Sequence, residues 1–129
     1  MKAAQRIEQA LQQIVCQPEH DETLIAEYFS PHYQQWVDGK SLDFDGFVQH
    51  MAAVKAATSS VCIEIQAIAE NGNEVLTHHR VSVVKPDASE AVIDVFARFT
   101  LCEGMIVRCQ ELTYPLSGAE EDRDLGSRR

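Results

Sequence analysis

The sequence predicts an α+β protein in which three helices and one short strand precede a four-stranded antiparallel meander. Apolar residues recur at helical spacing in three segments of the first half of the chain. The second half holds runs rich in β-branched and aromatic residues, and turn residues separate each run from the next. We therefore expect a mostly antiparallel sheet covered by the three N-terminal helices.

Length and composition favour one domain. The chain has 129 residues, of which 45% are hydrophobic, and this suits one compact core without room for a second. We assign residues 1–116 to this domain. The polar segment 117–129 has no apolar face, and we expect it to be a disordered C-terminal tail.

Charge and cysteine content exclude several classes of function. A net charge of -9 argues against nucleic-acid or anionic-membrane binding, because those partners need clustered Lys and Arg.

No run of the sequence approaches the roughly 18 apolar residues of a membrane helix. The four cysteines form no CxxC pair and no signal-like segment follows Met1, so we expect reduced thiols in the cytoplasm. Phosphate-loop, HExxH and GxSxG motifs are also missing.

The first two predicted helices lie before residue 31. An amphipathic helix that ends before Pro18 has its apolar residues at Ala3, Ile7, Ala10, Leu11, Ile14 and Val15. Asp21 can cap a second helix, and Ser30 with Pro31 stops it. The inner side of that helix carries Leu24, Ile25, Tyr28 and Phe29.

A short strand and a third helix follow. Residues 32–38 are predicted as the strand, after which Gly39 turns the chain. Asp43 can cap the third helix, although Gly46 weakens that helix by up to about 1 kcal/mol relative to Ala. Its predicted inner side consists of Phe47, Met51 and Val54.

The meander is predicted to contain strands at 61–69, 75–84, 91–101 and 106–114. Three-residue loops are expected at 70–72, 86–88 and 102–104, because a type I turn followed by a left-handed residue suits Gly at the last position. The Asn71-Gly72 pair could instead form a two-residue loop. We favour three residues because a change of one would mix polar and apolar side chains on each face.

This register places only two groups that can carry charge near neutral pH, His79 and Glu111, on the inner face. The whole predicted inner face consists of Ile63, Ile65, Ala67, Val75, Thr77, His79, Val81, Val83, Ile93, Val95, Ala97, Phe99, Leu101, Val107, Cys109, Glu111 and Thr113. Ile63, His79, Val95 and Glu111 are expected on one cross-strand row, which separates His79 from Glu111 by roughly 10 Å at the backbone.

The opposite face is predicted to be mainly polar but also to carry several large apolar side chains. Arg80 and Asp94 fall opposite each other there, as in a surface ion pair worth under about 1 kcal/mol. The apolar residues assigned to this outer face are Leu76, Val84, Val92, Phe96, Ile106 and Leu112. So much apolar area on a mostly solvated sheet predicts a partner.

The inner ionisable groups suggest chemistry, and each also has a structural interpretation. Glu111 in an apolar pocket would have a raised pKa and could abstract a proton, or it could be tied to a helix residue or water. His79 could polarise a carbonyl, or be satisfied by a hydroxyl. We expect Cys109 to be a small core thiol. A metal site is not expected, because the consecutive His78 and His79 point to opposite faces.

Two segments carry a resemblance to a known family. Residues 28–36, YFSPHYQQW, followed by Asp38-Gly39, resemble the SnoaL-like "YF.P.Y.QH…dG" pattern, and residues 98–107, RFTLCEGMIV, resemble its "rFrfrdGkIv" hairpin. The order of elements over residues 1–116 is similar to the cone-shaped fold of the nuclear transport factor 2-like superfamily. That superfamily includes SnoaL-like polyketide cyclases, ketosteroid isomerase and scytalone dehydratase.

The resemblance implies an inward apolar pocket and a homodimer formed through the outer sheet face. The chain departs from the family at Trp36, where the pattern usually has His, and at Ala97, where ketosteroid isomerase places its oxyanion-binding acid. The expected ligand-lining residues are Trp36, Tyr33, Val95, Ala97, Phe99 and Cys109.

Two functional hypotheses follow. The first is an enzyme without a cofactor that transfers protons on a small, largely apolar carbonyl compound, as isomerases, cyclases and dehydratases of this kind do. Glu111 would be its base and His79 its electrophilic or shuttling partner. The second is a non-catalytic dimeric module that binds a small ligand or another protein.

Overall fold

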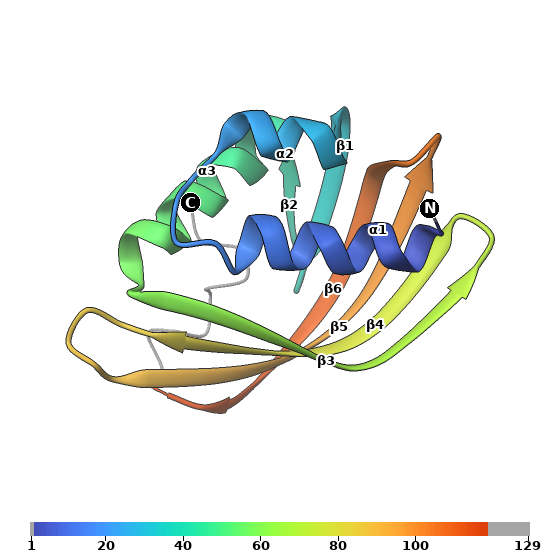
Figure 1. Cartoon of the computed structure of the whole chain (residues 1–129). Coiled ribbons are helices and arrows are strands. Elements are labelled where there is room, and N and C mark those ends of the chain that lie inside the picture. Colours follow the sequence, from blue (N-terminus) through green and yellow to red (C-terminus); the bar gives the residue numbers. More distant parts are fainter. Residues whose placement is uncertain (1, 119–129) are drawn as a thin grey trace.

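The computed structural model describes residues 2–118 and consists of helices and one six-stranded sheet (Figure 1). Of the predicted tail 117–129, Ser117 is instead the last residue of a strand, and residues 119–129 lie outside the described residues. The elements in chain order are α1 (Ala3–Ala10), the π-helical turn η1 (Leu11–Val15), α2 (Glu22–Tyr28), β1 (Phe29–Val37), β2 (Lys40–Asp43), α3 (Phe44–Ala57), β3 (Ser60–Asn71), β4 (Glu74–Val84), β5 (Glu90–Cys102) and β6 (Met105–Ser117).

The sheet has the strand order β2-β1-β6-β5-β4-β3, and all neighbouring pairs are antiparallel except β1 with β6. It curves strongly, and the helices cover its concave side (Figure 1). The predicted α+β architecture is thereby confirmed. β2 was not predicted, because its four residues are too few to show an alternating pattern.

Both predicted helix caps are present. The Asp21 side chain accepts a hydrogen bond from the Leu24 amide at 3.1 Å at the start of α2. The Asp43 side chain accepts one from the Gly46 amide at 2.7 Å at the start of α3. Each carboxylate satisfies an amide that the helix itself leaves unpaired.

The loop between β4 and β5 agrees with the prediction. The Lys85 amide donates to the Ser89 carbonyl at 2.8 Å, which closes a three-residue loop in which Ala88 has φ +71°. This loop aligns His79 with Val95 across the two strands.

The other two hairpins differ from the prediction. Asn71 pairs with Glu74 and Cys102 with Met105, so each loop contains two residues instead of three. A bulge then follows in each hairpin, with Gln66 as the extra residue on β3 and Val107 as the extra residue on β6. Each bulge inserts one extra residue and so restores the side chains to the predicted faces.

The predicted cross-strand row is wrong by two residues at both ends. His79 lies opposite Ile65 instead of Ile63, and Val95 lies opposite Thr113 instead of Glu111. Glu111 is paired with Ala97. The polarity of the faces could not reveal this, because a shift of two residues leaves every side chain on the same face.

Two residues beside the bulges were assigned to the wrong face. Ile106 was predicted on the outer face but is 0% exposed, because it pairs with Leu101 before the bulge changes the alternation. Ala67 was predicted inside but is exposed opposite His78.

The core fills the space between the concave sheet face and the helices. Its largest fully buried side chains are Tyr33, Ile7, Ile14, Ile25, Ile106, Val37, Val75 and Cys109. Within residues 2–118, no helix has the length and apolar character needed to cross a membrane. The same residues contain no group of three or more His, Cys, Asp or Glu side chains that could hold a metal ion.

Candidate functional site

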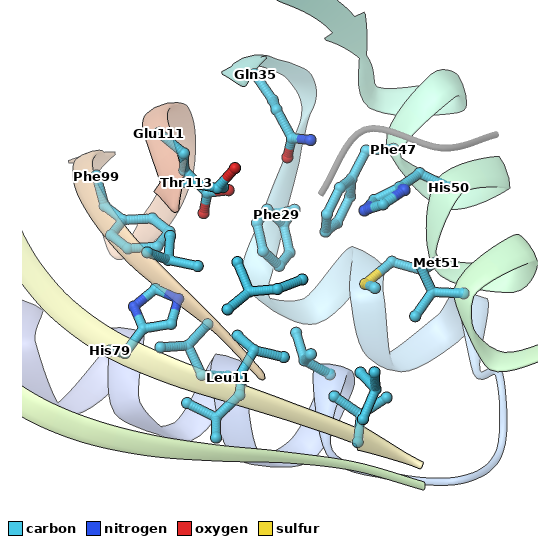
Figure 2. A pocket seen from close by; sticks show the side chains of 18 of the residues that line it. Leu11, Phe29, Gln35, Phe47, His50, Met51, His79, Phe99, Glu111 and Thr113 are labelled. Carbon is cyan, nitrogen blue, oxygen red and sulfur yellow. The ribbon is translucent and has the colours of Figure 1, made fainter. Parts of the chain in front are cut away.

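A cavity of about 120 Å³ lies between the concave face of the sheet and the helices (Figure 2). Side chains from η1, α3 and five strands form its wall. They are Leu11, Val15, Phe29, Tyr33, Gln35, Phe47, His50, Met51, Val54, Val61, Ile63, His79, Val81, Val83, Ile93, Val95, Phe99, Glu111 and Thr113.

Glu111 reaches this cavity from β6, where Val37 of β1 and Ala97 of β5 are its neighbours. Burial of the carboxyl group raises its pKa to about 7. The Cys109 thiol, which donates to Glu111 Oε2 at 3.5 Å, lowers that pKa, and the negative charge of Asp38 raises it. Near neutral pH, Glu111 is therefore present in both its protonated and ionised forms.

Asp38 holds the strand that carries Glu111. The Thr113 amide donates to Asp38 Oδ1 at 2.9 Å, and the Thr113 hydroxyl donates to Asp38 Oδ2. In return, the Asp38 amide donates to the Glu111 carbonyl at 3.1 Å. The turn between β1 and β2 thus fixes the backbone of β6 from Glu111 to Thr113.

His79 lies on β4 and is only 2% exposed. Burial lowers its pKa to about 4; the neighbouring His78 lowers it further, whereas Asp94 raises it. The imidazole is consequently neutral at physiological pH. Its Nδ1 is 2.9 Å from the Thr77 hydroxyl, which leaves Nε2 for a ligand.

Tyr33 and Gln35 form a buried polar pair on β1. The Tyr33 hydroxyl donates to Gln35 Oε1 at 2.9 Å. Burial raises the pKa of Tyr33 well above its ordinary value, so the phenol keeps its proton. Because the Gln35 oxygen is occupied, the amide nitrogen remains as the donor that a ligand could use. In Figure 2, Gln35 extends into the cavity beside Glu111 and Thr113.

The structure brings some of the expected lining residues to the cavity and not others. Tyr33, Val95 and Phe99 line it together with Glu111 and His79. Ala97 and Cys109 are buried on the same side of the sheet but are not part of the wall.

Trp36 was expected in the wall but lies on the opposite face of the sheet, where it is 38% exposed. On β1, Tyr33, Gln35 and Val37 are buried and point inward, so the strand alternation turns Trp36 outward. The replacement of His by Trp at this position therefore does not remove a group from the cavity.

Gln35 and His50 were not identified from the sequence as site residues. Gln35 could have been found from the strand alternation that it shares with Tyr33. His50 lies three residues after Phe47 and four before Val54, on the helical stripe already predicted to face inward. Thr113 had been placed on the inner face without a role.

His79 and Glu111 lie on different rows of the sheet. Two strand spacings and an offset of two residues separate their backbones by roughly 12 Å. Their side chains face the same cavity (Figure 2). They can therefore contact different parts of one small molecule without contacting each other.

The outer sheet face carries a second, more open hollow of about 550 Å³. Large exposed apolar side chains around it include Trp36, Leu76, Phe96 and Leu112. The predicted Arg80–Asp94 ion pair lies on the same face, with Arg80 Nε 2.8 Å from Asp94 Oδ1.

The structure is thus a small α+β cone whose curved sheet and helices enclose an apolar cavity. The chain belongs to the SnoaL-like family, because the model of the SnoaL-like domain matches residues 9–109. An uncharacterized protein from Schizosaccharomyces pombe is 34% identical over 100 residues, which are 78% of this chain and 77% of that protein.

Solved structures share the fold at low identity. Wild-type IdmH from Streptomyces antibioticus, described as a candidate polyketide cyclase, has a TM-score of 0.75 at 14% identity, covering 88% of this chain and 92% of that chain. An LEH-like epoxide hydrolase from M. tuberculosis has a TM-score of 0.73 at 13% identity, covering 87% and 82%. The predicted superfamily and fold are thus confirmed.

Proposed function

We propose that this protein binds a small, largely apolar carbonyl compound in the inner cavity and transfers a proton on it without a cofactor. The reaction would be an isomerisation, cyclisation or dehydration. The observation that carries this proposal is a carboxyl group with a pKa of about 7 in the wall of an apolar cavity. A base whose pKa lies near the working pH is well suited to proton transfer.

In this mechanism, Glu111 removes a proton from the carbon next to the carbonyl. In the tautomer in which Nδ1 of His79 accepts a hydrogen bond from the Thr77 hydroxyl, Nε2 carries the imidazole proton and can donate a hydrogen bond to the carbonyl oxygen. That donor stabilises the negative charge of the enolate. Glu111 then returns the proton to a different atom, which leaves the enzyme unchanged.

Deuterium exchange tests this proposal without knowledge of the natural substrate. Small ketones in D₂O would be incubated with the protein, and loss of the α-proton signal would be followed by NMR. Glu111→Gln should lower the exchange rate by about 10² to 10⁴-fold, the usual contribution of a general base, while ligand binding persists.

Glu64→Gln, on the exposed outer side of β3, is the matched control and should leave the rate unchanged. Equal exchange rates for Glu111→Gln and the wild type would sink the proposal. A metabolite panel screened by thermal shift would identify ligands, because a bound ligand stabilises only the folded state. These ligands would replace the model ketones in a second round of exchange measurements.

The second candidate function is a non-catalytic, dimeric module that binds a small ligand or another protein. It is favoured by the exposed apolar side chains on the outer sheet face, where Phe96 is 53% and Leu112 is 58% exposed. We propose that a second copy of the chain covers this face. For this function, Glu111→Gln should alter stability or affinity and no reaction rate.

The dimer is tested by sedimentation at micromolar concentration. Leu112→Asp would bury a charge in the interface and should convert a dimer to a monomer. The control is Ala56→Asp on the exposed side of α3, which should remain dimeric. A monomeric wild-type protein would remove this proposal.

We also propose a cytoplasmic location. The four cysteines are all free, and two of them, Cys62 and Cys102, are exposed. Exposed thiols persist in a reducing compartment, which supports this proposal.

A further inference from the structure

We propose that the cavity selects an uncharged compound about the size of one six-membered ring, and that the aromatic cluster of Phe29, Tyr33 and Phe47 sets this limit. The inference rests on the proposed function, because it names the ligand class of the same cavity. It goes beyond that function by excluding fused-ring and anionic compounds.

The volume of the cavity sets the size. At about 120 Å³, it is somewhat smaller than an engineered protein cavity of roughly 150 Å³ that accommodates benzene. A single ring with one polar substituent fills such a space, whereas a second fused ring would require the wall to move. Protein interiors resist such movement because they are close-packed.

Three aromatic rings occupy the space between α3 and β1. The ring centroids of Phe29 and Phe47 are 4.6 Å apart, those of Phe29 and Tyr33 are 4.8 Å apart, and those of Tyr33 and Phe47 are 5.1 Å apart. Each ring is thus in contact with both others, and the three rings close this side of the cavity as one unit. Phe47 and Met51 of α3 both point into the cavity (Figure 2).

The charges of the wall select against anions. Its ionisable side chains are Glu111, Tyr33 and two histidines, and none of the residues that line it is Lys or Arg. His79 is neutral at physiological pH, and an anionic ligand would be repelled by ionised Glu111. A carboxylate or phosphate would therefore lose its water without a Lys or Arg side chain of the wall to pair with.

The polar groups of the wall suit one carbonyl or hydroxyl group. Gln35 is only 6% exposed, and its oxygen is occupied by the Tyr33 hydroxyl, so its amide nitrogen is available to an acceptor. His79 offers Nε2 from another strand. The remaining wall is largely apolar and matches a hydrocarbon ring.

Saturation-transfer NMR with three probes tests this inference, because it detects the weak, millimolar binding expected of such small molecules. The probes are cyclohexanone, the bicyclic 1-tetralone and the anion cyclohexanecarboxylate. For the wild type, we expect transfer to cyclohexanone and at least about tenfold less to the other two. Shifts of the Thr113 and Val95 amide signals would locate the probe in the cavity.

Two enlarged variants test the role of the wall. Phe47→Leu and Phe29→Leu each remove one ring of the aromatic cluster from the cavity wall, and each should raise the signal of 1-tetralone several-fold while cyclohexanone still binds. If one variant does not fold, the other still decides the outcome. Ile106→Ala removes a buried side chain outside the cavity and should leave the selectivity unchanged.

The possible outcomes separate this inference from the proposed function. Equal binding of cyclohexanone and 1-tetralone by the wild type would overturn the size limit and leave the proposed function standing. Equal binding of cyclohexanecarboxylate would overturn the selection against anions. Enlarged variants that bind cyclohexanone but not 1-tetralone would overturn the role of the aromatic cluster. If no probe binds to the wild type or to either variant, both proposals fail.

Discussion

Glu111 can hold a proton at a pH where an exposed glutamate has already lost it, because its carboxyl group has exchanged water for an apolar wall. This raised pKa affects both the stability of the protein and the chemistry that Glu111 can perform. With a pKa of about 7, the same side chain can accept a proton in one step and donate it in the next. Asp38 and Thr113 fix the adjacent backbone, so the carboxyl group is held in place through both steps.

Ala88 allows a test at a single residue outside the site. It has φ +71° in the loop between β4 and β5, and this left-handed conformation costs an L-residue roughly 1–2 kcal/mol. Ala88→Gly removes that strain but makes the unfolded chain more flexible, at a cost of roughly 0.4–1 kcal/mol. We therefore expect a net increase of about 0.5–1 kcal/mol in the free energy of unfolding, measured by urea denaturation.

The same substitution in a helix provides the control. Ala53→Gly in the interior of α3 should lower the free energy of unfolding by about 1 kcal/mol, because Gly is a poor helix former. A decrease of similar size at Ala88 would contradict our interpretation of the loop.

At the scale of the elements, the hairpins show what the sequence can determine. The alternation of polar and apolar residues specifies which face a side chain occupies, and His79, Glu111 and Phe99 were correctly placed inside. It does not specify the position along the face. A two-residue loop followed by a one-residue bulge has the same parity as a three-residue loop, so the row of Glu111 was misplaced by two residues.

Other elements were predictable to different degrees. The caps of α2 and α3 were correct because Asp has a specific hydrogen-bonding role at these positions. Trp36 was placed in the cavity by a family resemblance, although the alternation along its own strand contradicts that placement. The cavity itself requires the packing of α3 on the sheet, which no local pattern contains.

The cap of α3 connects an element to the site. Asp43→Ala leaves the Gly46 amide without its 2.7 Å hydrogen bond and should lower the free energy of unfolding by about 1 kcal/mol. Since α3 carries Phe47, His50 and Met51 into the cavity, amide hydrogen exchange should accelerate first in the initial turn of this helix.

Asp45→Ala is the matched control. This exposed acidic residue lies in the same turn, but the hydrogen bond from the Gly46 amide goes to Asp43 and not to Asp45. It should cost much less stability than Asp43→Ala. Equal losses for the two variants would show that the effect comes from the charge at the helix terminus and not from the cap.

At the scale of the whole molecule, one sheet serves two surfaces. Its concave face and the helices enclose the cavity, whereas its convex face presents apolar side chains to the surroundings. The two buried ionisable groups, Glu111 and His79, lie on the concave side and deviate from their ordinary pKa values in opposite directions. Their effects on stability therefore oppose each other.

The sign of each effect follows from the protons bound by the folded and unfolded chains. The folded-state pKa of Glu111 is raised from 4.5 to about 7, so stability from this group is lost as the pH rises through that range. The folded-state pKa of His79 is lowered from 6.5 to about 4, so its stability is lost as the pH falls through that range. Between pH 4.5 and 6.5 the two contributions largely cancel.

Single substitutions should separate the pH dependence of stability that Glu111 contributes from the one that His79 contributes. For Glu111→Gln, the free energy of unfolding should rise with pH relative to the wild type, by up to about 1.4 kcal/mol per pH unit, to a total of roughly 3 kcal/mol at most. For His79→Asn, the free energy of unfolding of the variant minus that of the wild type should fall with increasing pH between 4 and 6.5, because only the wild type gains stability from His79 in this range. Urea denaturation at half-unit steps from about pH 4 to about pH 8 measures both curves. Carboxylates with a lowered pKa, such as Asp94, are common to all the proteins and cancel in the differences. Parallel curves for the wild type and Glu111→Gln would mean that Glu111 titrates like an exposed glutamate, and the proposed base would lose its physical foundation.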